Sequence, residues 1–91
     1  MLPLLALAQA GTTAVTKPDG YVACFTKVWL TDIIAFSNAN DASSAQAYLD
    51  TKKCIPLAGG VKVTIISVDG SQVQFAFRGE KLWTVRSALT K

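Results

Sequence analysis

Residues 54–89 read CIPLAGGVKVTIISVDGSQVQFAFRGEKLWTVRSAL, and glycine-bearing turns divide this stretch into short apolar runs. The run 61–68 is rich in β-branched residues, which favour a pleated and half-buried strand. Asp69-Gly70 follows, and this pair supplies the positive-φ positions of a two-residue type I′ hairpin. In the next run, 72–77, large apolar residues alternate with polar or small ones, which predicts one core face and one wetter face.

A third strand is expected over 82–85, after a turn at Gly79. Three strands that share an apolar face hold together where a lone hairpin would be marginal in water. The stretch therefore predicts an antiparallel β meander over 54–89, around which we expect the rest of an α+β domain to fold.

The segment 25–51 carries a different period. From Phe25 to Phe36 its apolar residues recur at intervals of three or four, which predicts one face of a helix with Thr26 as its N-cap. Because the segment is also rich in β-branched residues, a strand is the alternative. Asn38, Asn40 and Asp41 then supply loop and N-cap oxygens, and a second helix completes an αα-hairpin.

Two cysteines, Cys24 and Cys54, bracket this hairpin. An even cysteine count indicates a disulfide if this small chain is exported, as its N-terminus suggests below, and the disulfide would link the helical hairpin to the meander. The alternatives are two free buried thiols or a redox pair. On the disulfide interpretation residues 21–91 form a single domain, with the helical hairpin over 25–51.

The composition suits one globular domain, with 91 residues, 51% of them hydrophobic and 16% charged. The chain has no His and a single Glu, and its carboxylates fall mainly at expected caps and turns. Two cysteines without His cannot complete a tetrahedral zinc site within one chain. We therefore expect no catalytic residue, no metal site and no cofactor, and interpret the protein as something other than an enzyme.

Residues 1–10 carry an apolar run that ends in Ala8-Gln9-Ala10, the small-x-small pattern that a signal peptidase reads. The run is too short to span a bilayer, so no transmembrane span is expected. A signal peptide over 1–10 would place the mature protein in the periplasm or outside the cell. The alternative is an apolar N-terminal segment that is buried or bound to a partner. Residues 11–20 are small and polar and end in a Pro-Asp-Gly turn, which is typical of a linker.

Charge is unevenly spread along the chain. In residues 51–91 seven Lys and Arg face two acidic residues, whereas in residues 1–50 four Asp face two Lys. The excess positive charge in residues 51–91 could merely solvate the surface and protect strand edges from pairing with another chain. Alternatively it forms a contact surface for an acidic protein face or an anionic envelope component, such as a cell-wall polymer or a phospholipid headgroup. Nucleic acid is not expected, because no recognised binding motif accompanies the charges.

The candidate binding residues come from successive strands and turns of the expected meander, where an antiparallel sheet can bring them together. They are Lys62, Arg78, Lys81, Trp83 and Arg86. Trp83 would be an exposed recognition platform if Leu82 faces the core, and a core residue in the opposite register.

Several short motifs carry a resemblance to known proteins. They are Ala23-Cys24, Asn40-Asp41, Tyr48-Leu49, Lys53-Cys54-Ile55-Pro56-Leu57, Gly60-Val61-Lys62-Val63 and Leu82-Trp83-Thr84. Their arrangement resembles a group of small, mostly uncharacterised bacterial secreted or periplasmic proteins with a cysteine pair. From Ile55 onward the chain is also similar to bacterial SH3-like domains, in which a Gly-x-x-Val strand, a hairpin and a Trp-containing strand close a small barrel.

The resemblance implies an SH3-like β-barrel and an envelope location. SH3-like barrels bind peptides or cell-wall material in some families and are purely structural in others, so likeness of fold alone does not assign an activity. We expect a non-catalytic, secreted or cell-envelope module for binding and protein–protein interaction. The alternative is a small structural or accessory subunit of a larger envelope or phage-type assembly, and the chain could form a homo-oligomer.

Overall fold

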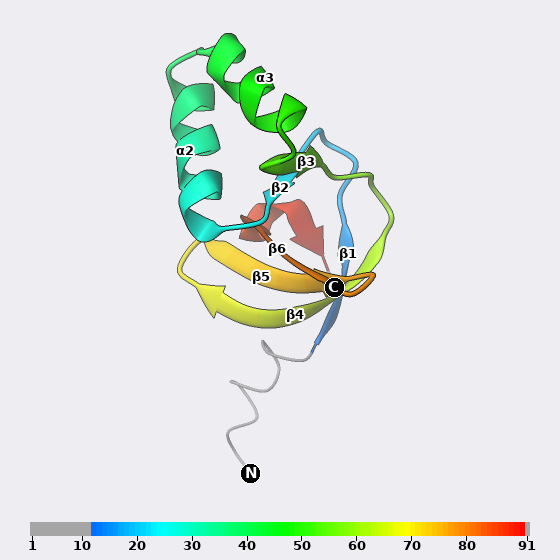
Figure 1. Ribbon diagram of the computed structural model, residues 1–91. Helices are drawn as coiled ribbons and strands as arrows, with labels where there is room; N and C mark the ends of the chain where they lie inside the picture. The colour runs from blue at the N-terminus through cyan, green and yellow to red at the C-terminus, as the bar shows by residue number, and fades with distance from the viewer. Residues whose placement is uncertain (1–11, 91) are drawn as a thin grey trace.

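The structure is a computed structural model, and it describes residues 12–90. Its elements are β1 (Thr13–Thr16), β2 (Val22–Cys24), α2 (Lys27–Asn38), α3 (Ala42–Asp50), β3 (Cys54–Pro56), β4 (Lys62–Asp69), β5 (Gln72–Phe77), β6 (Glu80–Val85), a 3-10 helix (Arg86–Ala88) and β7 (Leu89–Thr90). The seven strands form one antiparallel sheet in the order β3-β2-β6-β5-β4-β1-β7. Figure 1 shows the two helices together on one side of this sheet. The α+β class and the helical hairpin are thus confirmed.

The expected meander is β4, β5 and β6. Phe75 at its centre pairs with Ile65 on one side and Leu82 on the other, and all three side chains are buried. The period of two in β5 therefore predicted the core face correctly, because residues two apart on a strand share a face.

The turn of the first hairpin lies one residue later than predicted. Asp69 pairs with Gln72, so the loop residues are Gly70 and Ser71. Gly70 has a φ of 61°, whereas Asp69 and Ser71 are absent from the positive-φ residues. A positive φ at only the first loop position is the pattern of a type II′ turn, which is as compatible with strand twist as the predicted type I′.

The second hairpin has the two positive φ angles of a type I′ turn. Arg78 and Gly79 form its loop, with φ angles of 52° and 81°. This conformation is easy for glycine, whereas it costs an L-residue with a Cβ roughly 1–2 kcal/mol. The register of β5 and β6 therefore holds Arg78 in a backbone conformation that its side chain does not favour.

The linker predicted over 11–20 is wrong for Thr13–Thr16, which form β1. Ala14 pairs with Val63 of β4, and Thr16 pairs with Leu89 of β7. After this strand, Pro18 packs so closely on the loop before β4 that a Cβ at Gly59 would overlap it. The segment is therefore part of the domain, while the predicted signal peptide over 1–10 lies outside the described residues.

Thr16 joins β1 to the loop before β4. Its hydroxyl donates to the Ala58 carbonyl at 2.6 Å and accepts from the Val61 N–H at 2.9 Å. Its own backbone adds two further bonds, to Gly60 and Val61. Because Thr16 is only 2% exposed, water cannot replace these partners.

We expect Thr16→Val to lower the unfolding free energy by about 1–3 kcal/mol, because it leaves a buried donor and acceptor without a partner. Urea unfolding measures the change. Thr64→Val, an identical change at an exposed position of β4, is the control and should stay within about 0.5 kcal/mol of the wild type. Equal stabilities of the two variants would contradict the role of the Thr16 hydroxyl.

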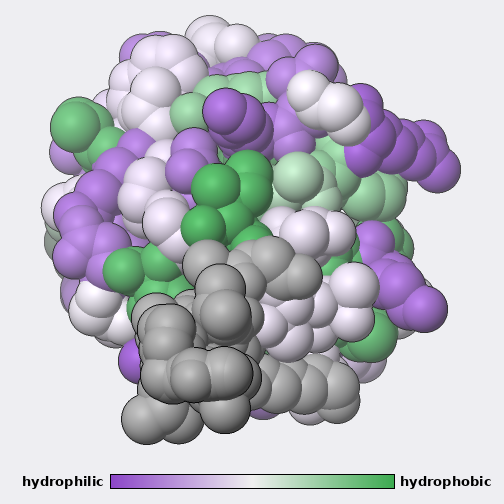
Figure 2. All heavy atoms as spheres, turned by 90° about the horizontal axis from the view of Figure 1, so that it is seen from below, coloured by the Kyte–Doolittle hydropathy of each residue, from purple (hydrophilic) through white to green (hydrophobic). Residues whose placement is uncertain are grey.

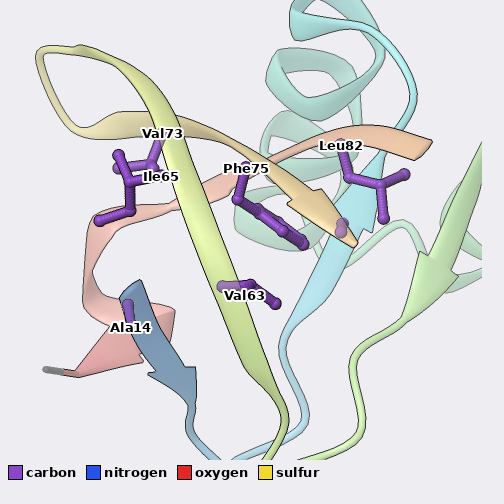
Figure 3. Close-up of a cluster of buried hydrophobic side chains, with 7 residues drawn as sticks. Ala14, Val63, Ile65, Val73, Phe75 and Leu82 are labelled. Atoms are coloured by element: carbon purple, nitrogen blue, oxygen red, sulfur yellow. The ribbon is translucent and has the colours of Figure 1, made fainter. Parts of the chain in front are cut away.

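Two hydrophobic clusters lie on opposite faces of the sheet. The first fills the inside of the curved meander and consists of Ala14, Ala23, Val63, Ile65, Val73, Phe75 and Leu82, most of them drawn in Figure 3. The second lies between the sheet and the helices and is built on Cys24, Leu30, Ile33 and Cys54. The short β2 supplies residues to both clusters, so it holds the helical hairpin and the meander together.

Side-chain oxygens begin both helices, as the sequence predicts. The Thr26 hydroxyl accepts from the Trp29 N–H at 3.1 Å, which caps α2. Asp41 accepts from the backbone and the hydroxyl of Ser44 and caps α3. These bonds from Ser44 lower the pKa of the Asp41 carboxyl, the side-chain bond contributing most, so the cap stays charged in mild acid. The alternative prediction, a strand in the segment after Thr26, is wrong because Lys27–Asn38 form α2.

Aromatic and polar contacts join α2 to α3. The Tyr48 hydroxyl donates to Asp32 at 2.8 Å, and this bond is the main cause that raises the pKa of Tyr48 above its ordinary value. The Phe36 and Tyr48 rings meet edge to face, with centroids 5.1 Å apart. Lys53 places its ammonium 4.7 Å from the Tyr48 ring centroid and 5.6 Å from that of Trp29, so this cation is used within the domain.

Candidate functional site

Three of the predicted binding residues lie at one end of the meander. Lys81 of β6 pairs with Ala76 of β5, and Ala76 pairs with Thr64 of β4. Lys62 lies two residues before Thr64, on the same face of the sheet. Arg78 occupies the β5–β6 turn beside them. We call Lys62, Arg78 and Lys81 the basic triad; all three are exposed.

Arg86 does not belong to this group, which corrects the prediction that four cations converge. It follows the far end of β6, and its N–H donates to the carbonyl of Ser71 at 2.8 Å. Its guanidinium reaches the Gly70 carbonyl at 3.4 Å. The six residues of β6 rise about 3.3 Å each, so roughly 20 Å separate Arg86 from the Arg78 turn. The sequence places both cations near β6 without showing that they lie at opposite ends.

Trp83 faces the helices. It lies on the opposite side of β6 from the buried Leu82, as required for an exposed platform, but it packs against the second hydrophobic cluster and is half-buried. The Lys27 ammonium sits 5.9 Å from its ring centroid. The helical hairpin thus makes Trp83 a packing residue and removes it from the candidate binding surface.

The basic triad has no acidic partner within residues 12–90. The single salt bridge in that range joins Lys27 and Asp69, and Glu80, next to the Arg78 turn, makes none. Figure 2 shows that hydrophobic residues reach the surface among hydrophilic ones on the face opposite the helices. Uncompensated charge and exposed apolar surface therefore occur on the same small domain.

An apolar groove opens beside Arg78. It has a volume of about 280 Å³, and nine of its ten lining residues are apolar. Its main lining residues are Ile55, Leu57, Val61, Val63, Phe75, Phe77 and Leu82. Arg78 is the tenth, and its guanidinium lies 5.0 Å from the Phe77 ring centroid.

Sequence reasoning missed this groove. The floor residues Val63, Phe75 and Leu82 are buried core, as their alternation predicts. The walls come from Ile55, Leu57 and Val61, which flank the Gly59-Gly60 loop and are only half-buried. Apolar residues on both sides of a glycine pair are the only signal in the sequence, and it does not distinguish a groove from a closed core.

Two of the other cavities lack the features of a binding site. One, of about 250 Å³, lies between α2, α3 and β2, and no charged side chain lines it. The other, of about 160 Å³, lies beside Arg86, whose guanidinium already contacts the Gly70 carbonyl. Within residues 12–90 no group of three His, Cys, Asp or Glu side chains is placed to hold a metal ion.

No protein family, curated protein or solved structure matches this chain. Both helices are short, and in the range that the structure describes neither is long and apolar enough to cross a membrane.

Proposed function

We propose that this protein is a non-catalytic binding module that holds an anionic partner at the β5–β6 turn. The observation that carries the proposal is the basic triad, three cations at one end of the meander without a salt bridge within residues 12–90. The β5–β6 hairpin presents Arg78 and Lys81, and the start of β4 presents Lys62 beside them. Binding groups are commonly displayed on turns of such scaffolds. An anionic partner would supply the negative charge that the basic triad lacks.

The proposed location is the periplasm or the extracellular space. The fully buried Cys24–Cys54 disulfide supports it, because disulfides persist in oxidising compartments. We further propose that the sheet is an SH3-like barrel. The packing of Ile55 and Leu57 on the first hydrophobic cluster supports this idea, since it brings the edge strand β3 onto the same core as β1 and β4.

The test is binding to poly-glutamate, an acidic polymer, measured by isothermal titration calorimetry. We expect binding to weaken between 0.1 M and 1 M salt, because the Debye length falls from about 10 Å to about 3 Å. Arg78→Gln/Lys81→Gln should weaken it about tenfold at 0.1 M salt, at roughly 0.5–1 kcal/mol for each exposed charge contact.

The matched control is Arg86→Gln/Lys52→Gln, which removes the same net charge at exposed positions outside the basic triad. It should change the affinity less than threefold. Equal losses in the two double variants would mean that net charge alone attracts the polymer, and the proposed site would be wrong.

A second candidate function is a subunit of a larger assembly. Val28 on α2 is 67% exposed, and Phe25 just before α2 is 37% exposed, so the helical hairpin carries apolar surface that an assembly could cover. A defined oligomer in size-exclusion chromatography with light scattering would favour this function, and a stable monomer would favour the binding module.

A further inference from the structure

The groove beside Arg78 points to a more specific ligand. We propose that it binds an alkyl chain ending in a carboxylate, the chemistry of a fatty acid, with the carboxylate on Arg78 and the chain in the groove. This inference rests on the proposed function, because it names the ligand class of the same turn. It adds an occupant for the apolar surface, which a purely ionic partner would leave empty.

The lining of the groove favours a hydrocarbon over a peptide. Arg78 is the only one of its ten residues with a charged or hydrogen-bonding side chain. A peptide would bring an N–H and a C=O with every residue, and each would lose water without gaining a side-chain partner. An alkyl chain makes no such demand, and its single polar end matches the single polar residue at the rim.

Arg78 is well placed to hold that polar end. Its guanidinium lies 5.0 Å from the centroid of the Phe77 ring, which itself lines the groove, and a cation over an aromatic face is held by the ring quadrupole. Guanidinium donors pair with a carboxylate through two parallel hydrogen bonds. Glu80 is the nearest acidic residue in sequence, and it forms no salt bridge with Arg78.

The size of the groove limits the length of the chain. Its volume of about 280 Å³ lies just below the range for small-molecule sites, roughly 300–1,000 Å³. A chain of medium length would fill it, and further carbons would extend into water. Affinity should therefore rise with chain length and then level off.

The experiment titrates the disulfide-bonded full-length protein with hexanoate, octanoate and decanoate below their micellar concentrations. Each methylene that enters the groove should raise the affinity about fourfold, so two carbons should give roughly 15-fold. Octanol and octyltrimethylammonium, which have the same chain without the anion, should bind at least tenfold more weakly than octanoate, as expected for losing a charged hydrogen bond.

Variants test the binding of the carboxylate and the binding of the alkyl chain separately. Arg78→Gln should lower octanoate affinity at least tenfold, while Arg86→Gln, the same change at the other end of β6, should leave it within twofold. Val61→Phe adds volume to the wall and should abolish the dependence on chain length. The chain-length series on the wild type provides the same information if Val61→Phe fails to fold.

The outcomes distinguish this inference from the proposed function. If poly-glutamate binds at the basic triad but carboxylate affinity ignores chain length, the groove is not the site and only the inference is overturned. Equal binding of octanol and octanoate, or an unchanged affinity in Arg78→Gln, would also overturn it. If neither polymer nor carboxylate binds, both the inference and the proposed function are wrong.

Discussion

Removing the Cys24–Cys54 disulfide should lower the unfolding free energy by about 3.5 kcal/mol, the chain-entropy value for a loop of this length. The cysteines are 30 residues apart in sequence and directly opposite each other on β2 and β3. Both are fully buried, and the closed loop contains the whole helical hairpin. Because α3 buries none of its residues completely, the hairpin depends strongly on this closure.

Thermal melting with and without reductant measures this effect, alongside the Cys24→Ala/Cys54→Ala variant, which avoids placing hydroxyls in the core. A domain of this size loses about 4–8 °C for each kcal/mol, so the melting temperature should fall by roughly 15–25 °C. An unchanged midpoint, or two thiols titrating in the unfolded oxidised protein, would contradict the bridge.

Phe75→Ala should cost about 3–5 kcal/mol, the usual range for truncating a buried phenylalanine. Phe75 is 0% exposed, and its strand pairs on both sides, so its neighbours cannot collapse into the cavity. The loss would be a large part of a total stability that is usually about 5–15 kcal/mol. Urea unfolding measures it.

Two variants bracket this prediction. Gln74→Ala, on the other face of the same strand, should cost under about 1 kcal/mol, since it creates no core cavity. Phe75→Leu keeps most of the volume and should remain folded at a cost of about 1–2 kcal/mol. Similar losses for Gln74→Ala and Phe75→Ala would mean that strand disruption, not the cavity, sets the cost.

The sequence predicted the elements whose signals are local. The alternation in β5 and the helical period after Thr26 each repeat over several residues, so tertiary contacts did not override them. The disulfide was predictable because the chain holds only two cysteines, on either side of a compact hairpin.

Long-range pairing explains what the sequence did not show. β1 is four residues long and becomes a strand because Thr13–Val15 pair with β4, almost fifty residues away in sequence. The first hairpin contains two candidate two-residue loops, Asp69-Gly70 and Gly70-Ser71. The pairing of Val68 with Val73, after a bulge in β4, selects the second.

The candidate site was predicted only in part for a similar reason. Arg78 and Lys81 flank one turn, so their proximity follows from sequence. The positions of Arg86 and Trp83 depend instead on the length of β6 and on the helices that cover one face of the sheet. The groove depends on how Ile55 and Leu57 stand against the meander, which no local pattern encodes.

The pairing of β1 with β7 determines how this domain could be held by a support. The two strands are antiparallel neighbours, with Val15 opposite Thr90 and Thr16 opposite Leu89. From Thr16 to Thr13 and from Leu89 to Thr90, the two strands therefore run in the same direction, toward the Gly70 end of β4 and away from the Arg78 turn. A sensor chip, a tag or a neighbouring domain that contacts β1 at Thr13 or β7 at Thr90 would therefore hold the sheet at the end away from the Arg78 turn.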